Sequence, residues 1–123
     1  MWEKTGSFGS LGTLEERVEQ LANIERVEKR DLHPGDRVII KTRNSVYSIY
    51  ALGDDHYLVS GGWFDRQGLS PAKMTISGCT WGGRAIKADF VAARGLCLEF
   101  GNQVMTTRIQ QFRLIRREEQ RVH

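Results

Sequence analysis

The sequence predicts a mainly β protein, in which about seven or eight short antiparallel strands form a small barrel or a folded-over sheet after one N-terminal helix. Three observations support this fold. From residue 37 onward, apolar and polar residues alternate with a period of two, turn-forming residues recur roughly every 6 to 12 positions, and no helix separates consecutive strands. Because an open sheet edge invites aggregation, we expect the sheet to close or to fold over.

Length and composition fit one soluble domain. The chain has 123 residues, of which 40% are hydrophobic and 27% are charged. No apolar stretch is long enough to cross a bilayer, and the first residues lack the pattern of a secretory signal. We therefore expect a cytoplasmic protein with no membrane contact.

The N-terminal part predicts a flexible lead-in at residues 1–12 and an amphipathic helical segment at 13–33. Thr13 and Glu16 fit a capping box, and the helix is expected over residues 13–31, before the break at Pro34. Its narrow apolar stripe consists of Leu14, Val18 and Leu21. Such a helix would cap an open barrel end or mediate self-association, so a homo-oligomer is one expectation.

Residues 34–116 form the predicted β domain, and residues 117–123 a charged tail. The expected strands are 37–42, 46–51, 56–60, 73–80, 84–89, 95–100, 103–107 and 111–115. Turns are expected at Arg43-Asn44 and Gly53–Asp55, and a tight hairpin at Gly101-Asn102.

The charge distribution leaves two interpretations open. The formal net charge is +3, with 5 basic and 8 acidic residues in 1–36, against 13 basic and 7 acidic residues in 37–123. A chain that is acidic first and basic last can bind nucleic acid through its basic part. Alternatively, an acidic helix can pack beside a basic C-terminal tail.

The glycine-rich stretch Ser77–Ala85, SGCTWGGRA, approaches the phosphate-loop pattern G-x-x-x-x-G-K-[ST] without completing it. Arg84 replaces the lysine and Ala85 replaces the hydroxyl that would bind magnesium. The following residues resemble a strand rather than the helix that a phosphate loop opens. We interpret the stretch as a turn, with Trp81 covering apolar surface.

The stretch Gly61-Gly62-Trp63-Phe64 raises a similar choice. Two glycines before two aromatics can form a bulge that aims the rings into a barrel end. Alternatively, Trp63, Phe64 and Trp81 form an aromatic ledge on which bases stack. The arginines near such a ledge would be Arg66, Arg84 and Arg94.

No catalytic or metal site can be assembled from the sequence. The three histidines, His33, His56 and His123, are scattered along the sequence. Cys79 with His56 is the best available candidate for a nucleophile and its base, but it is a weak one. Cys79 and Cys97 are expected to be buried, reduced thiols. We interpret Asp54-Asp55 as a solvated turn rather than a metal site, because a hard cation normally needs several more oxygen ligands. The sequence implies no cofactor.

Several stretches together resemble a known pattern. They are Thr42-Arg43-Asn44-Ser45-Val46-Tyr47, Gly61-Gly62-Trp63-Phe64, Gly78-Cys79-Thr80-Trp81-Gly82-Gly83 and Thr106-Thr107-Arg108-Ile109. Over about residues 35–115 the chain resembles small bacterial β-rich proteins of unassigned function that carry T-x-N-S-x-Y, G-G-x-F and G-[SC]-x-x-G-G stretches and a closing T-S-x-[IV] stretch. It departs at Cys79 and Thr107, where serine is usual, and the resemblance implies no activity. Pro34-Gly35-Asp36-Arg37-Val38 is similar to the first strand of many SH3-like barrels.

These observations favour a non-catalytic binding or interaction module for a protein or a small ligand. Asn44 and Ser45 suit a hairpin turn, and a polar binding role for Asn44, Ser45 and Tyr47 is the alternative. The candidate ligand-binding residues are Trp63, Phe64, Arg66, Trp81, Arg84, Asn44 and Tyr47. The alternative function is a nucleic-acid-binding β-barrel that uses the loop aromatics with Arg43, Arg66, Arg84, Arg94 and the C-terminal arginines.

Overall fold

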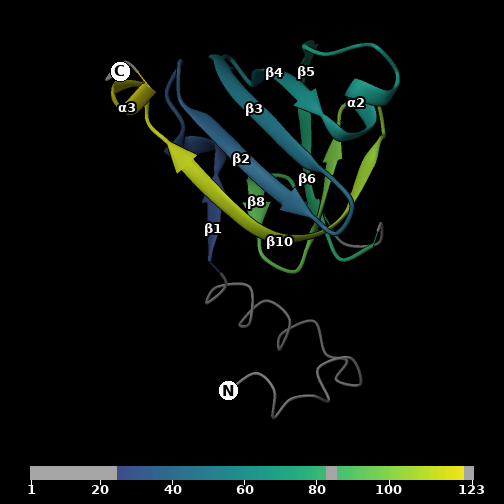
Figure 1. Cartoon of the computed structure of the whole chain (residues 1–123). Helices are drawn as coiled ribbons and strands as arrows, with labels where there is room; N and C mark the ends of the chain where they lie inside the picture. Colours follow the sequence, from purple (N-terminus) through teal and green to yellow (C-terminus); the bar gives the residue numbers. More distant parts are fainter. Residues whose placement is uncertain (1–24, 83–85, 121–123) are drawn as a thin grey trace.

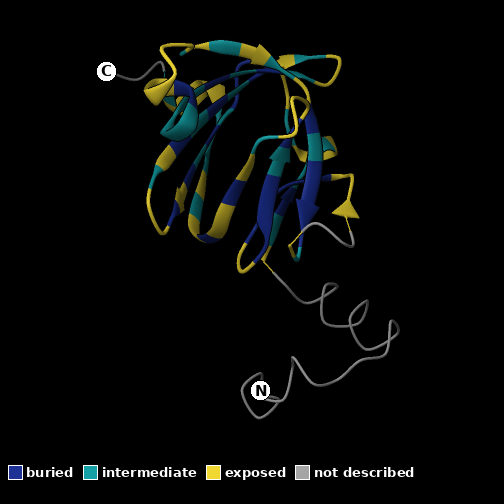
Figure 2. Ribbon diagram, turned by 90° about the vertical axis from the view of Figure 1, so that its right-hand side faces the viewer, coloured by how far each residue is buried: buried dark blue, intermediate teal, exposed yellow. Residues whose placement is uncertain are grey.

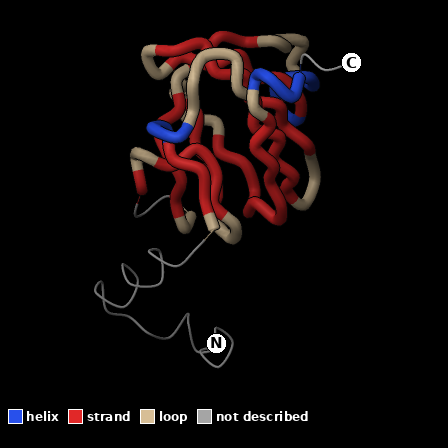
Figure 3. Tube along the Cα trace, turned by 90° about the vertical axis from the view of Figure 1, so that its left-hand side faces the viewer, coloured by secondary structure: helices blue, strands red, loops and turns tan. Residues whose placement is uncertain are grey.

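The computed structural model describes residues 25–82 and 86–120, and this part of the chain is mainly β (Figure 1). Strands make up most of the trace, and the helical segments are short (Figure 3). The predicted fold class is confirmed at the level of a β-rich chain with antiparallel sheets, and the described residues form two such sheets. In the described ranges, no helix is both long enough and apolar enough to cross a bilayer.

Eight antiparallel strands form the larger sheet. They are β2 (Arg37–Thr42), β3 (Val46–Gly53), β4 (His56–Gly61), β5 (Ala72–Met74), β6 (Ile76–Thr80), β7 (Ile86–Lys87), β9 (Cys97–Phe100) and β10 (Met105–Ile115). Their order across the sheet is β5-β4-β3-β2-β10-β9-β6-β7. Along β2 and β3, buried and less buried residues alternate, as the period-two pattern predicted.

The long strand β10 joins the two halves of this sheet. Its second part pairs with β2 from Ile109 to Ile115, and its first part pairs with β9 from Met105 to Arg108. Both pairings contain a register irregularity, which lets a strand bend. The sheet therefore folds over, and its halves face one another as two layers (Figure 2). Within the described residues β5 and β7 do not pair with each other, so the predicted alternative of a closed barrel is not found.

A second, two-stranded sheet replaces the end of the predicted N-terminal helix. Residues 26–31, expected to be helical, form β1 (Arg26–Glu28) and a short 3-10 helix, η2 (Lys29–Asp31), so this part of the prediction is wrong. β1 pairs with β8 (Phe90–Ala93), and Val27 is buried opposite Ala92. Pairing with a distant strand overrides local helical preference here. The remainder of the predicted helix, 13–24, and the lead-in 1–12 lie outside the described residues.

Most of the predicted strands correspond to observed strands, with different limits. The segment 73–80 is divided at Thr75 into β5 and β6, which belong to opposite halves of the sheet. The segment 84–89 contains only β7, and β8 follows it. The two strands expected at 103–107 and 111–115 are one strand, β10. The expected hairpin at Gly101-Asn102 connects the antiparallel strands β9 and β10.

The core lies between the two layers. Almost every residue of β6 and β9 is buried, and all four residues of β8 are buried. Figure 2 shows the buried segments gathered between the two layers. Tyr47, Phe64 and Phe100 form an aromatic cluster in which the ring of Phe64 meets that of Phe100 edge-on, with ring centroids 4.9 Å apart. Edge-to-face contacts of this kind add to the free energy gained by burial.

The C-terminal segment folds back on the start of β2. Residues 117–120 of the predicted charged tail form one helical turn, α3 (Arg117–Gln120). The amide of Gln120 donates to the backbone oxygen of Gly35 over 2.8 Å. The described part of the tail is thus attached to the β domain.

Candidate functional site

A pocket of about 110 Å³ brings together three separate parts of the chain. These parts are the turn between β2 and β3, the short helix α2 (Gly62–Arg66) and the residues around the start of β10. The pocket is lined by Thr42, Asn44, Ser45, Tyr47, Trp63, Arg66, Val104, Met105, Thr106 and Thr107. We refer to it as the turn pocket.

The turn that lines one side of the pocket is fixed by its own hydroxyl and backbone groups. The hydroxyl of Thr42 donates to the backbone oxygen of Ser45, and the backbone N–H of Ser45 donates to the same hydroxyl, both over 3.2 Å. The backbone N–H of Thr42 also donates to the Ser45 oxygen over 2.9 Å. The exposed Asn44 is thereby held at the mouth of the pocket.

Two glycines place α2 against the ring of Tyr47. Gly61 has φ 98° and Gly62 has φ 46°, values that glycine adopts without strain. A Cβ on Gly62 would overlap the Tyr47 ring. The backbone N–H of Trp63 donates to the Tyr47 hydroxyl over 3.4 Å. The turn of α2 therefore packs directly on Tyr47, and Trp63 and Arg66 reach the pocket.

The third side of the pocket comes from the start of β10. The buried hydroxyl of Thr106 accepts from the backbone N–H of Leu98 over 3.0 Å and donates to the backbone oxygen of Thr107 over 2.6 Å. Val104 is half-buried and Met105 is exposed. Together with Trp63 they give the pocket an apolar rim.

Three polar side chains in the turn pocket have groups left for a ligand. Within the described part of the chain, the Asn44 amide and the Thr107 hydroxyl make no hydrogen bond to protein. The Arg66 guanidinium makes one long hydrogen bond, over 3.4 Å to the Ser45 hydroxyl. The pocket can therefore offer a cation, an amide and a hydroxyl beside an apolar rim, which suits a small polar ligand with an apolar part.

Four of the seven predicted site residues meet in this pocket: Asn44, Tyr47, Trp63 and Arg66. Phe64 lies elsewhere, because its ring is completely buried in the core. This agrees with the interpretation of an aromatic plug, but the expected bulge is wrong, since a helical turn carries the rings. Sequence reasoning did not predict the β10 side, although Thr106 and Thr107 belong to one of the stretches that carry the resemblance.

The remaining predicted residues lie in other surroundings. Trp81 is partly buried against the core, and its backbone oxygen accepts from the Arg108 guanidinium over 3.1 Å. Arg94 pairs with Glu25 over 3.0 Å, and Arg116 pairs with Asp36 over 2.8 Å. Arg84 lies outside the described residues. Within the described ranges, the arginines and loop aromatics of the nucleic-acid alternative therefore do not share one pocket.

In the described part of the glycine-rich stretch, residues 77–80 belong to β6 and residues 81–82 bend, and the chain reverses direction between β6 and the antiparallel β7, as predicted. β6 pairs with β7 through Cys79 with Lys87 and Thr80 with Ile86. A phosphate loop would instead lead from a strand into a helix. Gly78 lies inside β6 with φ 134°, where the backbone of β7 passes too close for a side chain.

The cysteines lie in the core and are not poised for chemistry. Burial, with a smaller contribution from nearby Cys97, raises the pKa of the Cys79 thiol to about 12, so the nucleophilic thiolate is strongly disfavoured. Burial also raises the pKa of Cys97, and both thiols are free. The His56 ring nitrogen Nδ1 lies 2.9 Å from the backbone oxygen of Asp54 in an exposed turn. In the described residues no group of three or more His, Cys, Asp or Glu side chains could hold a metal ion.

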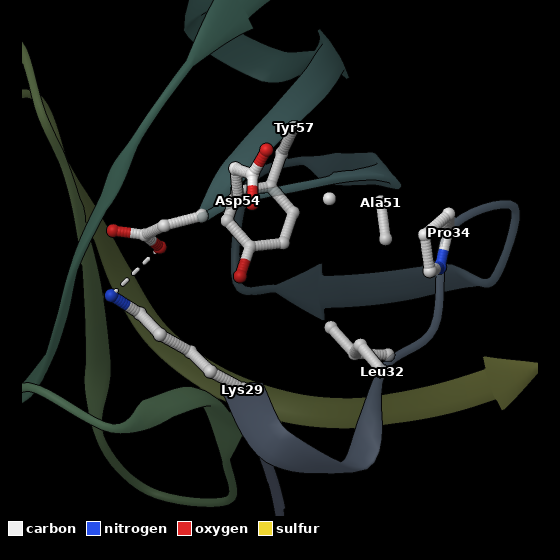
Figure 4. A pocket seen from close by; sticks show the side chains of 8 residues that line it. Lys29, Leu32, Pro34, Ala51, Asp54 and Tyr57 are labelled. Atoms are coloured by element: carbon white, nitrogen blue, oxygen red, sulfur yellow. Dashed lines mark ion pairs between the residues drawn. The ribbon is translucent and has the colours of Figure 1, made fainter.

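A second pocket, of about 150 Å³, lies between η2 and the β3–β4 turn (Figure 4). Lys29 closes it by an ion pair with Asp55 over 2.9 Å and a hydrogen bond to the backbone oxygen of Ile76 over 2.8 Å. Burial and the Asp55 carboxylate raise the pKa of Tyr57, another lining residue, to about 12. Because Lys29, Asp55 and Tyr57 already have protein partners, we interpret this pocket as structural.

The fold and the turn pocket define a β-rich protein with a small, partly polar recess. No family model, no curated protein and no solved structure matches this chain. The resemblances suggested by its motifs therefore stay predictions.

Proposed function

We propose that the chain is a non-catalytic binding module, and that its ligand places a small polar group, such as a carboxylate or a carboxamide, in the turn pocket. The observation that carries this proposal is the convergence of three distant stretches on one recess, with Asn44, Arg66 and Thr107 left able to bind. Trp63, Val104 and Met105 would contact the apolar part of the ligand.

A binding role suits these residues better than a catalytic one. A guanidinium such as that of Arg66 can bind a carboxylate through paired N–H groups. An amide and a hydroxyl add orientation without proton transfer. The thiol nearest to a nucleophilic role, Cys79, is buried in the core rather than in the pocket.

The test is an NMR titration of the full chain with N-acetylglycine, N-acetylglutamate and acetamide. A recess of this size should bind such fragments with a dissociation constant on the order of 1 mM, about −4 kcal/mol. We expect saturable shifts of the Trp63 indole and the Asn44 side-chain amide, with the Trp81 indole unchanged.

Two variants locate the binding. Arg66→Gln should abolish carboxylate binding, and Thr107→Phe should fill the mouth of the pocket and abolish binding of every fragment. Gln110→Phe is the matched control, because it adds the same ring at an exposed position of β10 outside the pocket. Shifts that do not saturate, or that persist in Thr107→Phe, would contradict the proposal.

A further inference from the structure

The outward-facing side of the half-sheet β5-β4-β3-β2-β10 carries four cations. We call this surface the outer face, and its residues are Arg37, Ile39, Lys41, Val46, Ser48, Tyr50, Leu58, Ser60, Lys73, Gln111, Arg113 and Ile115. Strand alternation fixes their direction. Val38 and Ile40 are buried, so Arg37, Ile39 and Lys41 point away from the core.

The same alternation orients the other strands of the outer face. Phe112 and Leu114 pack on the core, which turns Gln111 and Arg113 outward. In β5, Ala72 and Met74 pack on the core, which turns the exposed Lys73 outward. β10, β2 and β3 run side by side across the molecule (Figure 1).

The strand register lines these residues up in rows. One row crosses all five strands through Ile115, Arg37, Tyr50, Leu58 and Lys73. Within it, the Arg37 guanidinium lies over the Tyr50 ring, 5.0 Å from its centroid. A second row places Arg113 beside Ile39 and Ser48, and a third places Gln111 beside Lys41 and Val46.

No carboxylate interrupts this surface among the described residues of the five strands. Three of the carboxylates near its borders have protein partners. Asp55 pairs with Lys29, Asp65 accepts from Gly61 and Ser70, and Glu119 accepts from the backbone N–H of Arg116. The four cations therefore create a positive field whose complement is a chain of negative charges.

We propose that the outer face binds single-stranded nucleic acid. The step from Arg37 to Lys73 crosses three strand spacings, about 14 Å, and the step from Arg37 to Lys41 covers about 13 Å of strand. This area suits about three nucleotides, which together with both flanking phosphates present four phosphates. A sheet face does not enter a duplex groove as a helix or a ribbon does, but it can support a strand whose phosphates meet cations and whose bases stack on a ring or a guanidinium. Arg37 stacked on Tyr50 supplies that platform.

This inference goes beyond the turn pocket, because the two surfaces share no residue. The two proposals can therefore fail independently. Of the earlier nucleic-acid alternative, the loop aromatics, Arg43, Arg66 and Arg94 contribute nothing to the outer face, whereas Arg113, one of the C-terminal arginines, belongs to it.

The experiment is fluorescence anisotropy of the full chain with a labelled 12-nucleotide single-stranded RNA, at 50 and 200 mM salt. With four phosphate contacts, the log–log salt dependence should have a slope of about −3, which weakens binding roughly fifty-fold over this range. Lys41→Gln with Arg113→Gln should reduce the slope to about −1.5 and lower the affinity at 50 mM salt at least tenfold. Tyr50→Leu keeps an apolar side chain of similar size but removes the ring. It should lower the RNA affinity at 50 mM salt about tenfold.

Arg94→Gln is the matched control, because it removes an exposed cation from another part of the surface. It should change binding less than twofold. Circular dichroism of each variant checks that it is folded. A second test is Lys73→Gln alone, at an exposed position of the edge strand β5, which should change the slope of the log–log salt dependence by about 0.7.

The proposal is overturned if the chain does not bind RNA at 50 mM salt. It is also overturned if the outer-face variants bind as the unchanged chain does while Arg66→Gln or Trp63→Leu loses binding, because the site would then be at the loops. Equal affinity for a duplex of the same length, or for anionic phospholipid vesicles with no effect of Tyr50→Leu, would show a general anionic surface contact and overturn it as well.

Discussion

Asp36 and Arg116 lie 80 residues apart in the sequence, and the Arg116 guanidinium donates to the Asp36 carboxylate over 2.8 Å. The same carboxylate accepts the backbone N–H groups of His33 and Arg117, each over 2.9 Å. Asp36 is only 2% exposed. This residue therefore connects the entry into β2 with the exit from β10.

The pKa of Asp36 makes this connection sensitive to pH. Burial alone would raise the pKa, but the His33 and Arg117 N–H groups and the Arg116 guanidinium outweigh burial and hold it below 3.8. A carboxyl group whose pKa is lower in the folded state than in the unfolded state stabilises the fold at pH values above its unfolded-state pKa. This stabilisation is lost as the pH falls through the folded-state pKa. We expect Asp36→Asn to lower the free energy of unfolding by about 2 kcal/mol at pH 7.

Urea denaturation at pH 7 and near pH 3 measures this effect. The difference between Asp36→Asn and the unchanged chain should shrink at the lower pH, because both then approach a neutral side chain. Asp89→Asn, at an exposed carboxylate, should change stability by less than about 0.5 kcal/mol at either pH. An equal loss at both pH values would show that charge is not the cause.

The contact between Gly62 and Tyr47 predicts an unequal response of two glycines. Gly62 and Gly68 both have positive φ, 46° and 72°, but an added Cβ meets the Tyr47 ring only at Gly62 and nothing within 4 Å at Gly68. Gly68→Ala should cost about 1 kcal/mol for its backbone conformation. Gly62→Ala should cost about 3 kcal/mol or more, because overpacking adds to that strain. Thermal unfolding of the two variants checks this, and equal losses would contradict the packing of α2 on Tyr47.

The pairing of β1 with β8 predicts whether a substitution at Val27 lowers or raises the free energy of unfolding. Val27 is 5% exposed, so Val27→Ala should lower the free energy of unfolding by about 1–2 kcal/mol through lost packing. If residues 13–31 were a surface helix instead, alanine would stabilise that helix by up to about 0.7 kcal/mol. Val46→Ala is the matched control, because Val46 is 54% exposed, and it should change stability by less than about 0.5 kcal/mol. Urea denaturation distinguishes the two signs.

The buried thiol of Cys79 should resist modification in the folded protein. With a pKa of about 12, about one Cys79 thiol in ten thousand is ionised at pH 8. In the variant Cys97→Ala, which isolates Cys79, a thiol–disulfide reagent should react only as fast as the chain unfolds. Full reaction in urea confirms that the thiol is present. Rapid reaction in the native state would show that Cys79 is accessible.

The local features of the β domain could be predicted from the sequence because they depend on near neighbours. Alternation defined β2 with its observed limits, 37–42, and located β3 and β4 to within a few residues. Glycine and asparagine marked the turns that line the pocket. The sequence also identified Asn44, Tyr47, Trp63 and Arg66 as candidates, although it gave no reason for them to meet.

Tertiary structure decided the features that depend on distant partners. Residues 26–28 form a strand because Val27 finds β8, and two predicted strands merge into β10 because β2 and β9 pair with its two ends. The turn pocket exists only where a turn, a helix and a strand come together. The outer face exists because strand register, which depends on pairing between segments, aligns Arg37, Lys41, Lys73 and Arg113 on one side. Alternation determines which residues share a face of one strand, whereas only the folded sheet determines which strands share that face.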